Sequence, residues 1–436
     1  MGSGEKIVAW EVLTDMAKDW IEQGYTYAKE RYAQKGVDVD RAMELAAGIA
    51  LSMHCWQGDD VMGCEGGGGA SGGIATTGNY PGRARGADEL RADIDEVVRL
   101  IPGKTKLSLH ASYAELGGRK VDRDAYSIRE FENWVAWAKG QGMGLDFNTT
   151  FFSHPMAESG FTMSSADKGV RDFWIEHGKR CREIGAEFTK ALGERCVINH
   201  WMPDGYKDVP ADTVAPRRRM IESLDAMFVD KSLDEFVLDS VESKLFGLGV
   251  EQYTVGSHEL MMGYAITRKK LYTLDAGHFH PLEYISQKIS SVLQYLDQVF
   301  LHVSRGVRWD SDHVILLDDE LQNIMNEIIF NGYQDRVCIG LDYFDASINR
   351  IAAWVIGMRN AQKALLKALL TPIAGPRECE DEGDYAGRLA LLEEAKTLPF
   401  GCIWDAYCER QGVPVGEAWL NEVRDYERRV LSGRIG

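Results

Sequence analysis

The segment KLYTLDAGHFH, residues 270–280, is a short apolar run that ends abruptly in polar side chains. Its part LYTL is typical of a buried strand, and Asp275 and His278 follow where that strand would end. In a parallel sheet the buried strands are hydrophobic runs, and functional side chains gather at their C-terminal ends. The rest of the chain repeats this pattern.

Seven other segments change from apolar to polar residues in the same way, at 49–59, 106–113, 144–152, 195–205, 236–247, 298–305 and 336–345. Between several of these runs the apolar residues have helical spacing, at 87–101, 128–142, 167–192, 281–296 and 318–330. Eight strands that alternate with helices predict an α/β protein built on a (β/α)8 TIM barrel.

The predicted barrel spans residues 49–360, which suits a fold that needs about 250 residues or more. Before it, residues 14–36 have the pattern of an amphipathic helix, so 1–48 is interpreted as an N-terminal helical segment. After it, helical patterns at 350–370 and 389–411 have no strand between them. We interpret 361–436 as a helical C-terminal extension that packs against the barrel or a second subunit.

Composition excludes several classes of protein. The 436 residues carry a net charge of -18, which repels phosphate backbones and disfavours general nucleic-acid binding. The chain has neither a run of about 18 apolar residues nor the start of a signal peptide. Its eight cysteines form no C-x-x-C pair. These features predict a cytoplasmic protein with reduced thiols and no membrane partner.

A glycine-rich segment, residues 63–86, interrupts the alternation and is expected to be a long loop. One interpretation is a flexible linker. The other is a mobile lid over an active site, because the loop follows the first strand and so leaves the catalytic face of a barrel.

The polar ends of the last four predicted strands share one kind of chemistry. They supply only oxygen and nitrogen donors: Glu242, Asp275, His278, His302, Asp310, Asp312, and either Asp342 or Asp345. In a barrel these side chains project into one mouth, where the carboxylates would repel one another by several kcal/mol. A divalent cation among them would remove this repulsion.

Local spacing supports ion binding. Asp275 and His278 flank an Ala-Gly pair, and the glycine allows both donors to face one point. Asp310 and Asp312 lie on the same side of an extended segment. About seven donors exceed one octahedral shell shared with water and substrate, so two ions bridged by Asp275 are expected. The donors suit Mn²⁺, Mg²⁺, Co²⁺ or Zn²⁺.

Each of these residues alone has a simpler interpretation. An Asp-x-Asp pair is usually a solvated turn, and a single histidine at a strand end, such as His302, is more often a hydrogen-bonded core residue than a ligand. Their joint occurrence at successive strand ends favours the metal site.

The same residues lie in longer strings that resemble the L-rhamnose isomerase family. The match covers nearly the whole chain and includes SMHCWQGDDV (52–61), VESKLFG (241–247), LDAGHFHP (274–281) and GLDYFDASINRIAAWVIG (340–357). The resemblance implies a (β/α)8 barrel related to xylose isomerase and usually tetrameric. It also implies metal-dependent interconversion of L-rhamnose and L-rhamnulose, the first step of rhamnose catabolism.

Carried over to this chain, the resemblance implies two ions. A structural divalent ion would be held by Glu242, Asp275, His302 and an aspartate at the end of the last predicted strand, either Asp342 or Asp345. A catalytic ion, Mn²⁺ with Co²⁺, Mg²⁺ or Zn²⁺ as alternatives, would be held by His278, Asp310 and Asp312.

The resemblance also implies roles toward the sugar. Lys244 would polarise a substrate oxygen or an attacking water, and His110 would assist ring opening or contact a hydroxyl. Trp56 and Trp201 would form apolar walls. Asp310 and Asp345 are further expected catalytic residues, and Asp275 and His278 are expected to contact substrate. Hydride shift and proton transfer through an enediol both stay open.

Two other classes of function fit a barrel with such residues. One is a metal-dependent phosphodiesterase or endonuclease, which the acidic charge disfavours. The other is a non-catalytic sugar-binding barrel, which turnover alone would separate from an isomerase.

Overall fold

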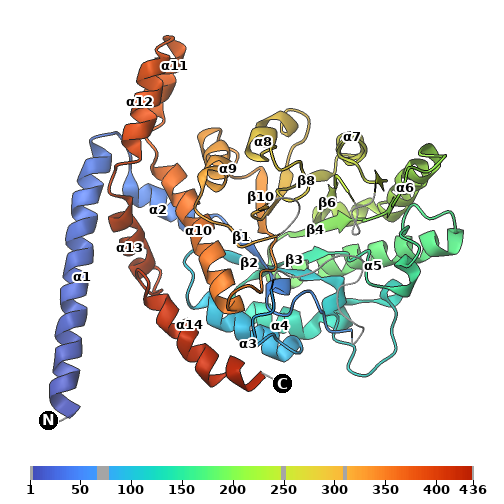
Figure 1. The fold of residues 1–436 in the computed structure, drawn as a ribbon, viewed down its shortest axis with the longest axis horizontal. Coiled ribbons are helices and arrows are strands. Elements are labelled where there is room, and N and C mark those ends of the chain that lie inside the picture. The colour runs from blue at the N-terminus through green and yellow to red at the C-terminus, as the bar shows by residue number, and fades with distance from the viewer. Residues whose placement is uncertain (1–2, 66–77, 247–251, 308–311, 435–436) are drawn as a thin grey trace.

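The structure is a computed structural model and describes residues 3–65, 78–246, 252–307 and 312–434, with side chains from residue 18 onward. Its centre is a closed barrel of parallel strands in the order β1-β10-β9-β8-β6-β4-β3-β2 (Figure 1). These strands are β1 (Leu51–His54), β2 (Thr105–His110), β3 (Gly144–Asn148), β4 (Cys196–Trp201), β6 (Val237–Glu242), β8 (Leu271–Asp275), β9 (Val299–Val303) and β10 (Val337–Leu341). Each predicted run overlaps one of them, and β2 begins one residue before its run, so the predicted (β/α)8 barrel is confirmed.

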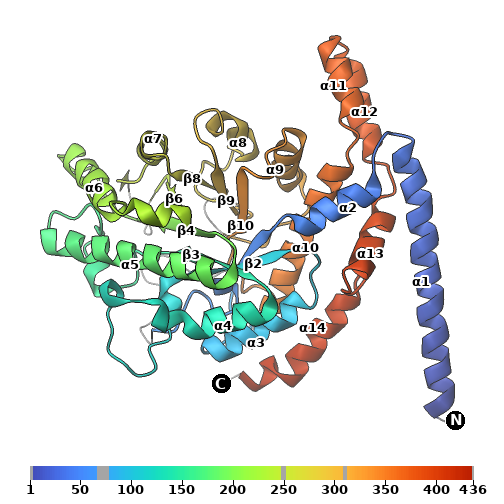
Figure 2. The same ribbon diagram turned by 180° about the vertical axis from the view of Figure 1, so that it is seen from behind.

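A helix follows each barrel strand and covers the outside of the barrel (Figure 2). These helices are α3 (Ala87–Val98), α4 (Glu132–Gln141), α5 (Lys168–Leu192), α6 (Val214–Met227), α7 (His258–Arg268), α8 (Ser286–Val292), α9 (Asp319–Phe330) and α10 (Arg350–Leu370). Local signals set their ends. Asp167, for example, accepts hydrogen bonds from the first turn of α5, and Gly193 ends that helix at φ +78°.

Helix α10 packs closely against the loop after β10. A Cβ atom on Gly357 would lie 2.0 Å from the hydroxyl oxygen of Tyr343, so only glycine fits this position. The Tyr343 hydroxyl donates a hydrogen bond to the Ala353 carbonyl, 3.0 Å away. The tyrosine therefore ties the last strand of the barrel to the helix that follows it.

Short elements appear that the sequence pattern did not predict. Helix α2 (Val39–Gly48) lies between the N-terminal helix α1 (Ser3–Ala33) and the barrel. Strands β5 (Gly205–Tyr206) and β7 (Tyr253–Thr254) pair as an antiparallel ribbon in the loops after β4 and β6. Elements of two residues are too short to produce a recognisable period.

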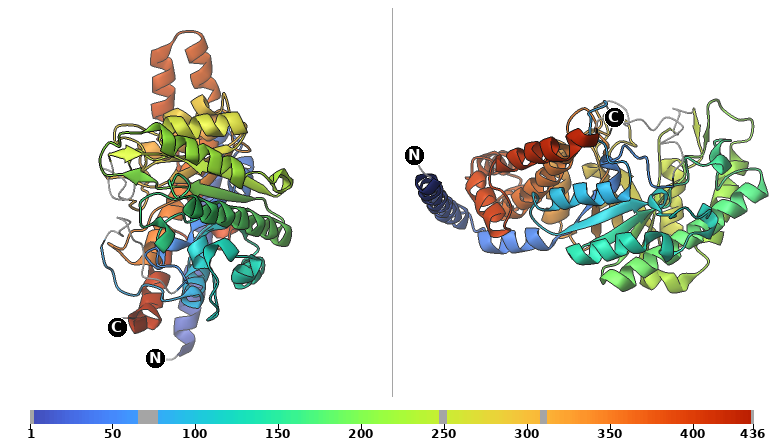
Figure 3. Two further views of the ribbon diagram at one scale, coloured as in Figure 1. Left: turned by 90° about the vertical axis from the view of Figure 1, so that its right-hand side faces the viewer. Right: turned by 90° about the horizontal axis from the view of Figure 1, so that it is seen from below.

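The buried side chains divide into a main core around the barrel and a second cluster at its side. The second cluster joins α1, α2, the end of α10 and α13 (Phe400–Arg410), and α1 and α13 run side by side (Figure 3). Helix α10 passes through residue 360 and contributes to both clusters. The domain boundaries predicted after residues 48 and 360 therefore remain predictions.

Helices α11 (Ala374–Asp381) and α12 (Tyr385–Ala395) form a hairpin that projects away from the barrel, and α14 (Ala418–Arg429) returns toward it (Figure 1). In the described part of the chain, no helix has the length and apolar character needed to cross a membrane.

Inside the barrel, side chains form layers along the strands. Val197, Leu271 and Phe300 make a small apolar cluster, separate from the main core. Because alternate residues of a strand share a face, Asn199 and Thr273 lie one layer closer to the C-terminal ends of the strands. Polar side chains thus lie at a level where branched apolar residues usually fill a barrel.

Candidate metal centre

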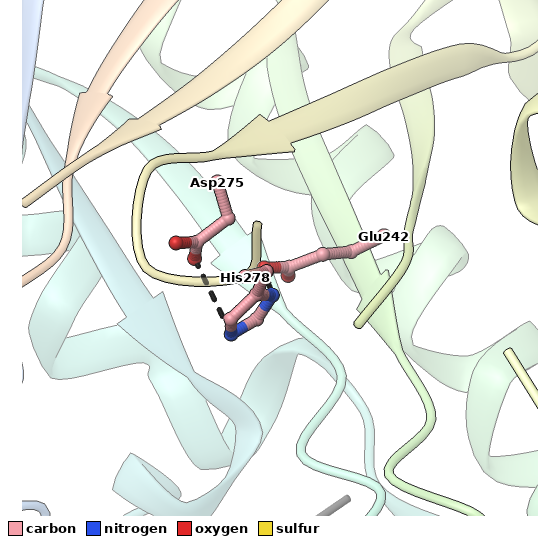
Figure 4. A group of neighbouring side chains, drawn as sticks. All are labelled: Glu242, Asp275 and His278. Atoms are coloured by element: carbon pink, nitrogen blue, oxygen red, sulfur yellow. Dashed lines mark ion pairs between the residues drawn. The ribbon is translucent and has the colours of Figure 1, made fainter. Parts of the chain in front are cut away.

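Side chains from neighbouring strand ends meet in two overlapping groups. Glu242 ends β6, Asp275 ends β8, His302 belongs to β9, and Asp342 follows β10. Glu242, Asp275 and His278 form one group of possible ligands (Figure 4), and Asp275, His302 and Asp342 form the other. Asp275 belongs to both groups and so lies where a bridging carboxylate is expected.

The Nδ1 atom of His302 faces three carboxylates. It lies 3.5 Å from Glu242 Oε1, 3.6 Å from Asp275 Oδ2 and 3.2 Å from Asp342 Oδ2. Neither His302 Nδ1 nor Glu242 Oε1 makes a hydrogen bond to a described residue, although both atoms are buried. Donors that share one ion at about 2.1 Å lie about 3.0–3.4 Å apart in octahedral and tetrahedral shells. The observed spacing is close to that expected for one ion.

The charges of these groups are linked. Burial raises the pKa of Asp275 to about 7, against the lowering effect of His278 and His302. Burial alone would lower the pKa of His302, but Glu242 and Asp342 raise it well above its ordinary value. A proton on His302 therefore balances part of the carboxylate charge in the metal-free protein. A divalent cation would balance that charge more fully.

The main chain orients His278. Its Nδ1 atom lies 3.0 Å from the carbonyl oxygen of Ser243, and the Ser243 hydroxyl lies 2.7 Å from His258 Nδ1. A proton donated from Nδ1 leaves the lone pair on Nε2, which lies 3.6 Å from Asp275 Oδ2. Hydrogen bonds of this kind orient the histidine ligands of metal sites.

The donor set decides which ions fit. Both groups offer carboxylate oxygens and imidazole nitrogens and no thiolate. This chemistry suits the divalent ions Mn²⁺, Co²⁺, Mg²⁺ and Zn²⁺. The residues present therefore fit a divalent cation.

The two aspartates after β10 have different surroundings. Asp342 Oδ2 faces His302, whereas Asp345 Oδ1 accepts hydrogen bonds from the amide and the hydroxyl of Ser347. Asp345 Oδ2 lies 3.4 Å from His313 Nδ1 and from the Val314 amide. The structure thus brings Asp342 to the ligand group and directs Asp345 to the neighbouring loop, a distinction that strand alternation left open.

Of the two predicted ligands Asp310 and Asp312, the structure describes only Asp312. Asp310 lies outside the described residues. Asp312 is buried, has a positive φ of 40°, and accepts a hydrogen bond from the Phe344 amide through its carbonyl oxygen. This backbone contact places Asp312 beside the loop after β10. The ligand roles of both aspartates stay predictions.

Lys244 lies two residues beyond Glu242 and is buried. Its ammonium nitrogen lies 4.6 Å from the ring centre of Trp201 and 5.4 Å from that of Phe246. Trp201 is also close to His278, with ring centres 5.7 Å apart. A cation over the face of an aromatic ring is attracted by the negative charge of that face.

His110 ends β2, and Trp56 lies just after β1. Their ring centres are 4.5 Å apart, and His110 Nδ1 lies 2.9 Å from Thr150 Oγ1. Burial lowers the pKa of His110 to about 3, so the ring is neutral at pH 7. Trp56 is almost fully buried, and its indole nitrogen donates a hydrogen bond to Asp342. Trp56 therefore contacts a ligand candidate, a contact that the predicted apolar wall did not include.

Asn199 was not among the predicted site residues, although it is buried on β4 and donates a hydrogen bond to Glu242 Oε2. Its segment, VINHW, shows no motif around the asparagine. The available signal was strand alternation, since Asn199 lies two residues before Trp201 and therefore shares its inward face.

The ends of the glycine-rich loop are well anchored. Glu65 forms an ion pair with the buried Arg123 and accepts a hydrogen bond from Tyr126. At the other end, the Tyr80 hydroxyl donates to Glu427. Residues 66–77 lie outside the described residues, so the choice between lid and linker stays a prediction.

Comparisons of the sequence with known families and curated proteins agree on one family. The family model for L-rhamnose isomerase (RhaA) matches residues 19–434. A curated L-rhamnose isomerase of Mannheimia succiniciproducens is 58% identical over 95% of this chain and 99% of its own length. The enzymes of that name from Rhodopirellula baltica and Escherichia coli K12 are 56% and 54% identical over 95% of this chain, and over 97% and 99% of their own lengths.

Solved structures are more distant. An L-ribulose 3-epimerase aligns with a TM-score of 0.46 at 14% identity, over 76% of this chain and 97% of its own. A D-psicose 3-epimerase from Clostridium cellulolyticum H10 aligns with a TM-score of 0.43 at 16% identity, over 72% and 96%.

The curated relatives decide between the classes of function. They are isomerases, they match along nearly their whole length, and they do not favour the phosphodiesterase alternative. The family model covers the same span as the barrel and its helical additions. The chain is therefore an isomerase that belongs to the L-rhamnose isomerase family.

Proposed function

We propose that the two overlapping ligand groups are the active site at which this chain interconverts L-rhamnose and L-rhamnulose. The observation that carries the proposal is the position of His302 Nδ1, which faces three carboxylate oxygens at 3.2–3.6 Å. Such a cluster of like charges is stable only with positive charge among them. Membership of the L-rhamnose isomerase family supports the substrate.

The proposed ligands divide between two ions. Glu242, Asp275, His302 and Asp342 would hold a structural divalent ion, and His278, Asp310 and Asp312 would hold a catalytic one. We propose Mn²⁺ as the catalytic ion, with Co²⁺, Mg²⁺ or Zn²⁺ as alternatives. When bound, such an ion polarises a sugar carbonyl as a Lewis acid. Asp345 is left out of this set because its oxygens are engaged by Ser347 and the loop at 313–314.

Side chains of the chain itself would position the sugar. The Lys244 ammonium, close to Trp201, would donate a hydrogen bond to a sugar oxygen near the reacting carbons. Because His110 is neutral at pH 7, its ring both donates and accepts, which suits contact with a sugar hydroxyl or proton transfer during ring opening. Trp201 offers an aromatic face to the apolar side of the sugar.

Assembly and location belong to the proposal as well. We expect a cytoplasmic homotetramer. Exposed aromatic side chains on the long helix α1 and the projecting hairpin support self-association, since Trp20 is 64% exposed and Tyr385 is 62% exposed. The free cysteines agree with a reducing compartment. Light scattering coupled to size-exclusion chromatography would measure a tetramer, and a monomer at micromolar concentration would contradict this assembly.

The experiment that tests the function combines metal removal with an assay. Metal is stripped with a chelator, Mn²⁺ is restored, and ketose formation from L-rhamnose is measured at each stage. We expect turnover to disappear with the metal and to return with Mn²⁺. Turnover that is undiminished in metal-free protein would refute the proposed site, and metal-dependent binding without ketose formation would indicate a sugar-binding protein.

A further inference from the structure

Three polar side chains form a continuous hydrogen-bonded chain inside the barrel. Ser240 Oγ lies 2.6 Å from Thr273 Oγ1, and Thr273 Oγ1 lies 2.8 Å from Asn199 Oδ1. The amide nitrogen of Asn199 contacts Glu242 Oε2. These residues come from β6, β8 and β4, and all are buried. The chain ends at a carboxylate that the proposed function assigns to metal binding.

The direction of every hydrogen bond in this chain is determined. Asn199 Oδ1 only accepts, so the Thr273 hydroxyl donates to it, and the Ser240 hydroxyl must then donate to Thr273. The Asn199 amide group in turn donates to Glu242, whose ionised carboxylate only accepts. Each bond therefore polarises the next toward Glu242, and the bonds strengthen one another.

As a result, the two carboxylate oxygens of Glu242 have different partners. Asn199 engages Oε2, while Oε1 is left to ion-pair contacts with histidines. Oε1 is the oxygen that lies 3.5 Å from His302 Nδ1 and 3.0 Å from His278 Nδ1. Since rotation of the carboxylate would break the bond to Asn199, the chain keeps Oε1 directed at the two histidines.

We propose that Asn199 is a positioning residue that reserves Oε1 of Glu242 for the structural ion, and that Thr273 and Ser240 support it. This inference rests on the proposed function, because it presumes that Glu242 binds metal. The competing explanation is that these three polar side chains only fill the interior of the barrel and do not affect metal binding. Apolar side chains would fill this layer without the cost of burying polar groups, so the orientation of Glu242 gives a specific reason for the amide.

The barrel offers a matched control in the same layer. Asn148 is an equally buried asparagine on β3, directly paired in register with Asn199, and it donates to Ser108 Oγ at 2.9 Å. Its hydrogen bonds go to β2 and do not reach Glu242. Replacing it removes a buried amide of the same kind without touching the ligand.

The test titrates Mn²⁺ into metal-free full-length protein by calorimetry and records the visible spectrum of the Co²⁺ form. We expect Asn199→Ala to weaken the first Mn²⁺ binding step by about 10–100-fold and to change the Co²⁺ spectrum. Thr273→Val should weaken this Mn²⁺ binding step less than Asn199→Ala does. Thr273→Ser keeps the hydroxyl and should bind Mn²⁺ with the wild-type affinity. Asn148→Ala should leave affinity and spectrum unchanged.

The melting temperature of each metal-free variant separates structural damage from ligand positioning. Should Asn199→Ala fail to fold, the Mn²⁺ affinities of Thr273→Val and Thr273→Ser still show whether the hydrogen-bonded chain affects metal binding. Wild-type affinity in Asn199→Ala or in Thr273→Val, or equal weakening in Asn148→Ala, would overturn the inference. Wild-type protein that binds neither Mn²⁺ nor Co²⁺ would instead overturn the metal centre itself, a separate and recognisable outcome.

Discussion

The indole nitrogen of Trp56 donates a hydrogen bond of 2.9 Å to Asp342 Oδ1, although 286 positions separate the two residues in the sequence. This bond joins the region after the first barrel strand to the region after the last and holds the carboxylate whose other oxygen faces His302. Closure of the barrel brings the two residues together.

Trp56→Phe tests the role of this hydrogen bond. The variant keeps an aromatic ring but removes the donor, so we expect Mn²⁺ affinity and kcat/KM to fall by about 10-fold or more. Trp201→Phe is the matched control, because the indole nitrogen of Trp201 has no hydrogen-bond partner among the described residues. That variant should keep wild-type metal affinity. Equal affinities in the two variants would show that Trp56 acts only through its shape.

Exchanging each of the two aspartates after β10 for asparagine tests which one is a ligand. Asp342→Asn should lower Mn²⁺ affinity and reduce kcat by about 100-fold or more, because it removes charge from the group around His302. Asp345→Asn should keep metal affinity within a few-fold of wild type and should lower the melting temperature, because its oxygens bind the loop instead. Calorimetry and melting curves measure both effects, and the reverse pattern would return Asp345 to the metal centre.

A buried charge network on the outer face of the barrel predicts how stability depends on pH. Asp239 lies 2.8 Å from Lys270 Nζ, 2.9 Å from His200 Nε2 and 3.0 Å from Arg182 Nε. Burial alone would raise the pKa of Asp239, but His200, Lys270 and Arg182 lower it below its ordinary value. The unfolded chain therefore binds more protons below about pH 4, so this stabilisation is present above that pH and is lost as the pH falls.

Asp239→Asn should accordingly lower the free energy of unfolding by about 3–5 kcal/mol at neutral pH. It leaves the buried cations Arg182 and Lys270 with only the partly exposed carboxylate of Asp234 as counter-charge. The difference from wild type should shrink as the pH falls from about 5 toward 3. Melting temperatures of the wild type and of Asp239→Asn, measured at each pH, report this difference in stability. The control is Asp225→Asn, whose ion pair with Arg268 is 43% and 41% exposed and is worth less than about 1 kcal/mol. A deficit that stays constant with pH would show that Asp239 acts through packing.

Substitution of alanine for two helical glycines, Gly357 and Gly263, should change the stability of the protein in opposite directions. Gly357→Ala places a methyl group 2.0 Å from the Tyr343 hydroxyl oxygen, and we expect it to destabilise the protein by about 1–3 kcal/mol. Gly263→Ala, on α7, meets nothing within 4 Å and should stabilise it by about 0.5–1 kcal/mol through helix propensity. Chemical unfolding of both variants measures the two signs. Destabilisation by Gly263→Ala would contradict the open position of that residue.

The sequence by itself determined the barrel and the kind of donor at its mouth. Buried parallel strands must be apolar runs, and their polar ends must meet at one rim, so the positions of Glu242, Asp275 and His302 followed from local pattern alone. The inward face of a strand follows from a period of two residues, which depends only on the backbone.

Only the tertiary structure decided which groups contact one another beyond the strands. Asp342 and Asp345 lie three residues apart in a segment without a period, and contacts with Trp56, His313 and Ser347 direct them to different places. Asn199 likewise acquires its relation to Glu242 from the pairing of β4 with β6. Such contacts join residues distant in the sequence, and they depend on the closure of the barrel, which no local pattern records.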